Sequence, residues 1–305
     1  MRYVVTGAAG FIGSHLAETL TAGGHEVVAV DCLTDYYDPA EKEGNAHGLD
    51  LLRIDLAERE LDLSAVDGVF HLAGQPGVRS FGDAFPIYLR RNVLATQRVF
   101  QTAAEARVRV VFASSSSVYG EAERYPTPES AMPQPISPYG ITKLACEQLA
   151  HAYAASFELD GVVLRYFTVY GPRQRPDMFF RRVCDALRDG STFEIYGTGE
   201  QSRSFTEVGD AVAATVAAME QAPPGALYNV GGGAEATMLE AIHLLEEISG
   251  RALDVRHVDA ARGDVSRTKA DVTRIRDALG WEPRVPLADG LARMWAWASA
   301  RVATP

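Results

Sequence analysis

A short apolar segment near the start of the chain runs directly into three regularly spaced glycines. Residues Tyr3–Thr6 precede Gly-Ala-Ala-Gly-Phe-Ile-Gly at positions 7–13, and a helical pattern follows over Ile12–Ala22. The first glycine permits a tight turn, the second lets the backbone approach a pyrophosphate, and the third lets helix and strand pack closely. Because the helix then offers free N–H groups and a positive dipole end, this order predicts a dinucleotide-binding loop. The residues of the loop are Gly7, Gly10, Phe11, Ile12 and Gly13.

Short apolar runs and helical patterns alternate through the first half of the chain. Because these runs are too apolar for strands with one face in water, they predict a parallel sheet covered on both faces. The expected strands are Tyr3–Thr6, Glu26–Val30, Leu51–Ile54, Gly68–His71, Val108–Ala113 and Gly161–Arg165. The expected helices between them are Ile12–Ala22, Tyr88–Ala106 and Tyr139–Phe157.

The pattern changes after residue 165. The next stretch, 166–199, is rich in Arg, Pro, Gly and aromatic residues, with one helix expected near Phe179–Arg188. A return to the sheet is expected near 206–230, through a helix near Val208–Ala218 and a strand at Ala226–Val230. Further helices are expected near Met238–Ser249, Asp271–Leu279 and Leu287–Ala300. We therefore predict an α/β protein, with a Rossmann-type doubly wound sheet (1–165 plus the return segment) and a smaller interleaved C-terminal substrate domain (mainly 166–305).

Composition excludes several classes of function. The formal charge of −11 argues against a broad positive surface for nucleic acid, and no apolar run approaches the ~20 residues of a membrane-spanning helix. The first apolar stretch is too short for a secretion signal. Three isolated cysteines, Cys32, Cys146 and Cys184, lack the spacing of a zinc site. We therefore expect a protein of the reducing cytoplasm without disulfides, a metal or a membrane partner.

Asp31 ends the second expected strand, where a dinucleotide would place its adenosine ribose. Its carboxylate would accept hydrogen bonds from the ribose hydroxyls and repel a 2′-phosphate, which favours NAD over NADP. The alternative is that Asp31 only caps the strand end.

Tyr139 and Lys143 lie one helical turn apart, after Ser137 as an expected N-cap and Pro138 as a first-turn residue. An ammonium group beside a phenol favours the phenolate, which can act as a base. Only 3 of the 29 basic residues are lysines, so a lysine here indicates a task that arginine performs poorly, such as bonding ribose hydroxyls. The alternative is an ordinary surface pair.

The GxxGxxG spacing resembles the extended short-chain dehydrogenase/reductase family, and later landmarks of that family follow in order. They are Asp55-Leu56 after the third strand, His71-Leu72-Ala73-Gly74 after the fourth, and Asn92 on the next helix. The resemblance implies NAD contacts from Asp55, Leu56, Leu72, Ala73, Gly74, Asn92, Tyr139, Lys143 and Tyr166. It also implies a homodimer through the helices over Tyr88–Ala106 and Tyr139–Phe157.

Alignment on Val118-Tyr119-Gly120 places the family's catalytic hydroxyl at Ser115, which would bind the reacting sugar oxygen and share its proton with Tyr139. Related dehydratases carry Asp-Glu after this residue, and related decarboxylases commonly carry Glu just before Val-Tyr-Gly. This chain has Ser116 and Ser117 there, which are poor proton-transfer groups and are expected to face the substrate. Any one of these serines could instead be a turn residue.

The stretch from Arg165 to Met178 and the segment Gln75–Arg79 resemble those of UDP-glucuronate 4-epimerases, including Thr168 where galactose-type epimerases usually carry Asn. The resemblance favours Arg175, then Arg79, for a sugar carboxylate, while Arg173 offers a similar planar fork. Surface salt bridges are the alternative. Further substrate contacts implied by the resemblance are Tyr196 beside the uracil, Arg203 and Arg262 at the phosphates, and Asp264.

Together with these motifs, the resemblance implies an NAD-dependent enzyme that epimerises a UDP-sugar at C4, with UDP-glucuronate as the expected substrate, through a 4-keto intermediate. Two alternatives stay open: a dehydratase or decarboxylase of the same family, and an NAD-binding sensor without turnover.

Overall fold

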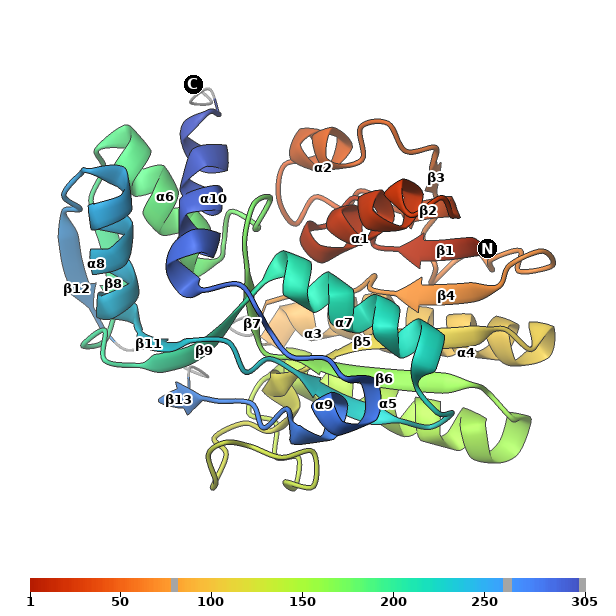
Figure 1. Ribbon diagram of the computed structural model, residues 1–305. Coiled ribbons are helices and arrows are strands. Elements are labelled where there is room, and N and C mark those ends of the chain that lie inside the picture. Colours follow the sequence, from red (N-terminus) through yellow and green to blue (C-terminus); the bar gives the residue numbers. More distant parts are fainter. Residues whose placement is uncertain (78–81, 260–264, 302–305) are drawn as a thin grey trace.

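Seven parallel strands form the central sheet in a computed structural model of the chain, which describes residues 1–77, 82–259 and 265–301 (Figure 1). The strand order is β3-β2-β1-β4-β5-β6-β10, which confirms the Rossmann-type doubly wound arrangement. The strands are β1 (Arg2–Thr6), β2 (Glu26–Asp31), β3 (Leu51–Arg53), β4 (Gly68–His71), β5 (Arg109–Ser115), β6 (Gly161–Tyr166) and β10 (Leu227–Val230). The chain winds in opposite directions from neighbouring β1 and β4, and such a switch point leaves a ligand-binding crevice at the carboxyl ends of the strands.

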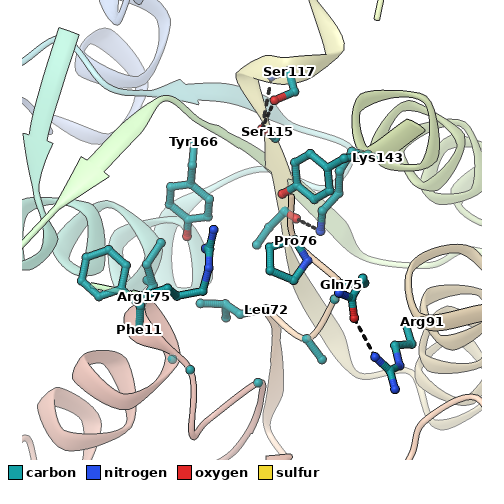
Figure 2. A pocket seen from close by; sticks show the side chains of 18 of the residues that line it. Phe11, Leu72, Gln75, Pro76, Arg91, Ser115, Ser117, Lys143, Tyr166 and Arg175 are labelled. Atoms are coloured by element: carbon teal, nitrogen blue, oxygen red, sulfur yellow. Dashed lines mark hydrogen bonds between the residues drawn. The ribbon is translucent and has the colours of Figure 1, made fainter. Parts of the chain in front are cut away.

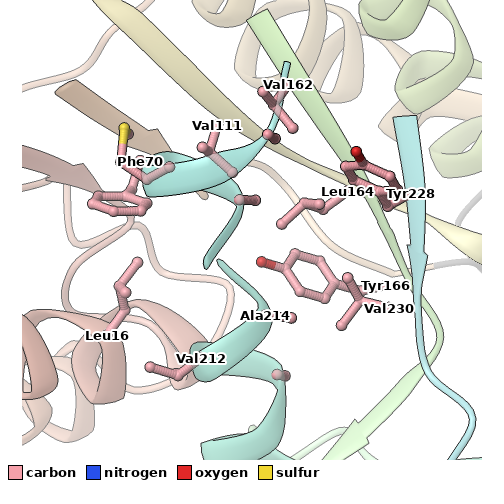
Figure 3. Close-up of a cluster of buried hydrophobic side chains, with 14 of the residues drawn as sticks. Leu16, Phe70, Val111, Val162, Leu164, Tyr166, Val212, Ala214, Tyr228 and Val230 are labelled. Atoms are coloured by element: carbon pink, nitrogen blue, oxygen red, sulfur yellow. The ribbon is translucent and has the colours of Figure 1, made fainter. Parts of the chain in front are cut away.

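Helices cover both faces of this sheet, as the apolar strands predict. Helices α1 (Phe11–Ala22) and α7 (Val208–Gln221) cover one face, and α4 (Ala95–Ala106) and α5 (Pro138–Phe157) cover the other. Figure 3 shows the first core, where Leu16 and Val212 meet Phe70 and Leu164 from the strands. No helix in the described ranges is both long and apolar enough to cross a membrane.

The rest of the chain forms a C-terminal lobe beside the sheet, at the left of Figure 1. Its helices are α6 (Phe179–Asp189), α8 (Met238–Ser249) and α10 (Leu287–Ser299). Its short strands are β7 (Thr168–Tyr170), β8 (Phe193–Tyr196), β9 (Ser202–Glu207), β11 (Glu235–Thr237), β12 (Val255–Val258) and β13 (Arg267–Thr268). A separate core, which includes Phe180, Phe205, Leu245 and Met294, holds the lobe together.

The expected return to the sheet takes place through α7 and β10, and β10 pairs in parallel with β6. A second return was not predicted. Helix α9 (Thr273–Leu279) and Trp281 enter the same core as α7, and the Trp281 indole donates to the Asp210 carbonyl at 3.0 Å. The chain therefore crosses between sheet and lobe more often than its sequence pattern indicates.

Two local departures from the sequence analysis bear on the site. The helix expected over Tyr88–Ala106 is broken into α3 (Phe85–Tyr88), a π-helical turn over Leu89–Leu94, and α4. Such turns are rare and often occur at functional sites. A short helix that was not predicted, α2 (Pro39–Asn45), follows β2 and is capped by Asp38, whose carboxylate accepts from the Ala40 N–H at 2.9 Å.

Candidate active site

A cavity of about 490 Å³ opens at the switch point between β1 and β4. The loops that follow β1, β2, β4 and β5 form one side of it, and the C-terminal lobe contributes the other (Figure 2). The predicted site residues that line it are Gly7, Gly10, Phe11, Ile12, Gly13, Asp31, Asp55, Leu56, Leu72, Ala73, Gly74, Ser115, Ser116, Ser117, Tyr139, Lys143, Tyr166, Thr168, Arg175 and Arg203. Motifs that are far apart in the sequence therefore meet in one place.

The glycine loop after β1 has the geometry that its spacing predicts. Gly7 has a positive φ of 71°, and a side chain there would meet the Ala73 backbone at 2.8 Å. A Cβ at Gly13 would lie only 2.0 Å from the Gly7 carbonyl oxygen, so strand and helix require glycine to pack this closely. Gly10 precedes α1 without a side-chain cap, which leaves the first-turn N–H groups of the helix available to an anion.

Two carboxylates line the far end of the cavity, away from the serines. Asp31 is the last residue of β2, and Asp55 follows β3. Asp31 accepts from the backbone N–H groups of Ala9 at 3.2 Å and Leu33 at 2.8 Å, so it supports its own loop as well as lining the cavity. Asp55 accepts from the Ala57 N–H and pairs with Arg90 at 2.7 Å. A carboxylate has about four lone-pair sites, so both retain acceptor capacity for ribose or adenine donors.

Sequence reasoning missed Lys42 and Tyr37, which line the same end of the cavity. The Lys42 ammonium donates to the Thr34 hydroxyl at 2.9 Å and lies 4.5 Å from the centre of the Tyr37 ring. Burial lowers the pKa of Lys42 and raises the pKa of Tyr37 to about 12. The Tyr37 hydroxyl is buried with no hydrogen-bond partner within the described ranges, as expected where a polar ligand supplies one. Together with the glycine loop, these groups fit a dinucleotide.

Asn92 corrects one expectation, because it does not line the cavity. Its side chain is buried behind the loop after β4, where Oδ1 accepts from the Gln75 N–H at 2.6 Å and Nδ2 donates to the Thr142 hydroxyl at 3.0 Å. Gln75 does line the cavity and accepts from Arg91 at 2.7 Å, as Figure 2 shows. Asn92 therefore positions this loop against α5, and Arg91, which also lies in the π-helical turn, holds the Gln75 side chain.

The predicted catalytic groups meet where β5 ends and α5 begins. Ser115 is the last residue of β5, and its hydroxyl donates to that of Ser117 at 3.1 Å. Lys143 is 4% exposed, and its ammonium donates to the Ala113 carbonyl at 2.7 Å and lies 5.8 Å from the centre of the Tyr139 ring. All three side chains line one stretch of the cavity.

The start of α5 fixes this arrangement. Ser137 is the N-cap and accepts from the Gly140 N–H at 3.1 Å, with Pro138 in the first turn, as the sequence predicts. A Cβ at Gly140 would lie 2.4 Å from the Ser117 carbonyl oxygen. Glycine at this position therefore lets the helix that carries Tyr139 approach the serine loop.

A buried ion pair behind the catalytic groups ties their elements together. Arg165 on β6 binds both carboxylate oxygens of Glu147 on α5, at 2.9 and 2.6 Å, and each side chain is about 5% exposed or less. The Ser114 hydroxyl also donates to Glu147. Because Ser114 precedes Ser115 and Glu147 lies one turn after Lys143, this cluster sets the distance between the serine and the Tyr139–Lys143 helix.

The C-terminal lobe brings Arg175 to the cavity, opposite the serines. Its Nε donates to Oδ1 of Asp177 and its Nη2 donates to Oδ2, both at 3.0 Å. These two bonds leave Nη1 without a hydrogen bond to any described residue. Asp177 also accepts from the Tyr36 hydroxyl at 3.2 Å, and burial, followed by the charge of Asp177, raises the pKa of Tyr36 to about 12. Arg173, the other candidate, pairs with Glu18 at 2.7 Å and does not line the cavity.

A smaller cavity of about 170 Å³ adjoins the first and shares Thr168, Met178 and Arg203 with it. Tyr196 lines only this second cavity, where its ring centre is 5.9 Å from the Arg182 guanidinium. Arg203 donates to the backbone carbonyls of Ser202 at 2.8 Å and Val265 at 2.7 Å. The expected substrate residues Arg79, Arg262 and Asp264 lie outside the described residues.

The positions of the acidic residues in the main cavity limit the reactions that the site can catalyse. Within the parts of the chain that the structure describes, the acidic residues lining the main cavity are Asp31 and Asp55, both at the far end. The same parts contain no cluster of three or more potential metal ligands. No carboxylate of the described residues therefore lines the cavity beside Ser115, since Glu147 lies behind the serines, bound to Ser114 and Arg165. Tyr139 lines the cavity there and can exchange a proton with a ligand.

Comparisons with known proteins match this geometry. Residues 3–231 match the family described as the NAD dependent epimerase/dehydratase family. The chain is 39% identical to the uncharacterized UDP-glucose epimerase YtcB of Bacillus subtilis, and the alignment covers 98% of each protein.

Two solved structures are also similar. The UDP-glucuronic acid 4-epimerase of Bacillus cereus, in complex with UDP-glucuronic acid and NAD, has a TM-score of 0.94 and 38% identity, with 98% of this chain and 99% of that one covered. MoeE5 in complex with UDP-glucuronic acid and NAD has a TM-score of 0.88 and 44% identity, covering 97% and 98%.

Proposed function

Because the chain belongs to the NAD dependent epimerase/dehydratase family, we propose that it interconverts the C4 epimers of a UDP-sugar, with UDP-glucuronate and UDP-galacturonate as the pair. One observation carries this choice within the family. Ser115, Tyr139 and Lys143 line the same stretch of the cavity, and the neighbouring positions are Ser116 and Ser117. Dehydration needs a second acid–base pair, which hydroxyl groups supply poorly.

Tyr139 takes the proton from the C4 hydroxyl, and Ser115 holds the sugar oxygen through its own hydroxyl group. The ammonium of Lys143 stabilises negative charge on the phenol, and its hydrogen bond to Ala113 keeps it in place. When bound, NAD would supply the acceptor for the C4 hydrogen and its electron pair, and the glycine loop, Asp31 and Lys42 are the residues that would hold it. For the configuration at C4 to invert, the 4-keto sugar must present its other face before the hydrogen returns. Tyr139 then returns the proton to the oxygen, so the net redox change is zero.

Arg175 would bind the carboxylate of the sugar through Nη1, beside its bidentate contact with Asp177. The 4-keto sugar is a β-keto acid, which loses carbon dioxide when the carboxylate bond aligns with the carbonyl π orbitals. An arginine that holds the carboxylate away from that alignment suppresses the loss by positioning alone.

The test is to incubate the NAD-loaded protein with UDP-glucuronate and to identify the product by NMR. We expect UDP-galacturonate in equilibrium with the starting sugar. UDP-pentose as the main product would show a decarboxylase, and NAD binding without any product would support the sensor alternative.

The proposal extends to the organisation of the protein. Residues 1–165 and the return segment near 206–230 would bind NAD, and 166–305 would mainly bind the nucleotide sugar.

A homodimer would bury Ile87, Leu89 and Ile141, which are 44%, 44% and 47% exposed on α3, the π-helical turn and α5. The three unpaired thiols favour the reducing cytoplasm. Light scattering on the protein and on Leu89→Glu tests the dimer, since the charge should yield a monomer.

A further inference from the structure

The segment 34–45, which follows β2 and includes α2, forms one side of the NAD end of the main cavity. Thr34, Tyr36, Tyr37 and Lys42 line the cavity from this segment. Its far end is tied to the glycine loop, because the Asn45 side chain donates to the Ala9 carbonyl at 3.2 Å. A dinucleotide in the cavity would therefore lie against this segment.

The other side of the segment is gripped by the C-terminal lobe through Glu41, the neighbour of Lys42. Arg181 on α6 donates to both oxygens of Glu41, at 3.0 and 3.2 Å. Arg301, just beyond α10, donates to the same carboxylate at 2.7 Å. We name these three residues, Glu41, Arg181 and Arg301, the latch.

The lobe holds its half of the latch rigidly. Arg181 is 5% exposed, donates to Asp185 at 2.7 Å, and also bonds the backbone carbonyl of Gln174. The Trp297 ring lies beside both arginines, with its centre 5.2 Å from Arg181 and 4.8 Å from Arg301. Movement of the 34–45 segment away from the cavity would take the shared carboxylate away from both arginines, and buried Arg181 would keep only Asp185 as a carboxylate partner.

We propose that Glu41 is a positioning residue that retains NAD, because its latch to the lobe holds the 34–45 segment against the cofactor. The inference rests on the proposed function, in which the cofactor ends each cycle in the state in which it began. A protein that released the reduced cofactor between the two hydrogen transfers would be left with a keto sugar that it could not reduce. Slow release of the cofactor is therefore an advantage in this reaction. In an enzyme that must exchange its cofactor in every catalytic cycle, slow release would instead lower the turnover rate.

The experiment measures cofactor release without any sugar. The full-length protein is loaded with NADH and chased with excess NAD, and the loss of bound-NADH fluorescence gives the release rate. Glu41→Gln should release NADH about 10-fold faster, because charge-assisted hydrogen bonds to two arginines become weaker neutral ones. Arg301→Gln removes one of the three hydrogen bonds that Glu41 accepts from the two arginines and should give a smaller acceleration.

Glu43→Gln is the matched control. Glu43 lies on the same helix, and its only described ion pair is with Arg53 at 2.8 Å, where both side chains are more than half exposed. Its release rate should equal that of the unmodified protein. Equal rates for Glu41→Gln and Glu43→Gln would overturn the proposal, as would an unmodified protein that does not hold NADH.

The outcome is separable from the proposed function. Slow release that Glu41→Gln accelerates, combined with no epimerisation of any UDP-sugar, would leave the latch in place and reject the epimerase. Thermal unfolding of the cofactor-free variants identifies any general loss of folding, because a latch acting on NAD should change release far more than the unfolding temperature.

Discussion

The two sides of the main cavity are held in place by different kinds of contact. The sheet wall, which we define as Ser115, Tyr139 and Lys143, rests on a buried ion pair and on hydrogen bonds between adjacent elements of one domain. The lobe wall is defined as Arg175 and the 34–45 segment, which follows β2 but is bound by the lobe. Glu41 of this segment pairs with Arg181 and Arg301, which are distant in sequence, whereas Arg175 pairs with nearby Asp177. Apart from Arg181, these side chains are about one-fifth exposed or more.

This difference assigns the chemical steps to the sheet wall and the binding and release of ligands to the lobe wall. Buried ion pairs are costly to separate and are only weakly screened by salt. The sheet wall should therefore keep Ser115, Tyr139 and Lys143 in a constant arrangement for proton transfer. Partly exposed pairs are weaker and are screened by ions, so the contacts of the lobe wall should open more readily than those of the sheet wall and should set the rate at which ligands are released. Mutations in the sheet wall should therefore lower turnover, and those in the lobe wall should change binding and specificity.

Tyr139→Phe should have the largest effect. Removing the phenol oxygen removes the acid–base group, and kcat should fall by about 10²–10⁴-fold. Tyr153→Phe is the control, because Tyr153 lies on the same helix but its hydroxyl accepts from Gln97 at 2.6 Å, away from the cavity. Turnover measured by NMR that is equal in the two variants would remove the sheet wall from the chemistry.

Glu147→Gln should come next, and its effect should appear in stability as well as in kcat. It leaves the Arg165 charge buried without its partner, so the free energy of unfolding should fall by about 3–5 kcal/mol. Denaturant unfolding followed by circular dichroism measures the change. Asp277→Asn, which breaks the exposed pair with Arg276, should change stability by less than about 1 kcal/mol. Similar losses in both variants would mean that burial of the sheet wall does not matter.

Arg175→Gln should discriminate between substrates. A hydrogen bond to a charged group contributes about 1.5–3 kcal/mol, so kcat/KM for UDP-glucuronate should fall by about 10–100-fold. The value for UDP-glucose, which has no carboxylate, should change much less. Arg173→Gln should leave both values unchanged, because Arg173 pairs with Glu18 outside the cavity. An equal loss for both sugars would show that Arg175 does not read the carboxylate.

Lowering the pH should produce the smallest of these effects. It should reduce the stability of the folded protein through His71, the last residue of β4. His71 is fully buried between the hydroxyls of Thr6 and Thr96, and burial, aided by the charge of Lys143, lowers its pKa to about 3. The unfolded chain binds a proton near pH 6.5 and the folded one does not, so stability falls as pH drops below that value.

Between pH 7 and 5.5 the contribution of His71 amounts to about 1 kcal/mol. Denaturant unfolding at the two pH values measures it. His71→Gln should flatten the dependence by that amount, whereas replacing the exposed His243 should not. An unchanged slope in His71→Gln would exclude His71 as its source.

The sheet wall and the glycine and β4 loops beside it were largely predictable, because their signals are local. Gly7 and Gly13 are needed within one turn, and Tyr139 and Lys143 lie on one helix face behind a recognisable cap. The exception, Asn92, was placed near the right loop but assigned a direct contact, since periodicity cannot distinguish a residue that lines a cavity from one that supports its wall.

In the lobe wall, Arg175 was predicted by resemblance, whereas the contacts of the 34–45 segment were missed for a physical reason. Glu41 meets Arg181 and Arg301, which are 140 and 260 residues away, and no short-range pattern encodes such pairs. One signal was available for Lys42. The scarcity of lysine, which drew attention to Lys143, applies equally to Lys42, and both line the same cavity.

The most direct test follows the hydrogen on C4. UDP-glucuronate carrying deuterium at C4 is converted in ordinary water by the NAD-loaded protein, and the product is examined by NMR. The account predicts UDP-galacturonate with deuterium still at C4, because the hydrogen leaves and returns without exchange with solvent. Product with ordinary hydrogen at C4 would contradict the account.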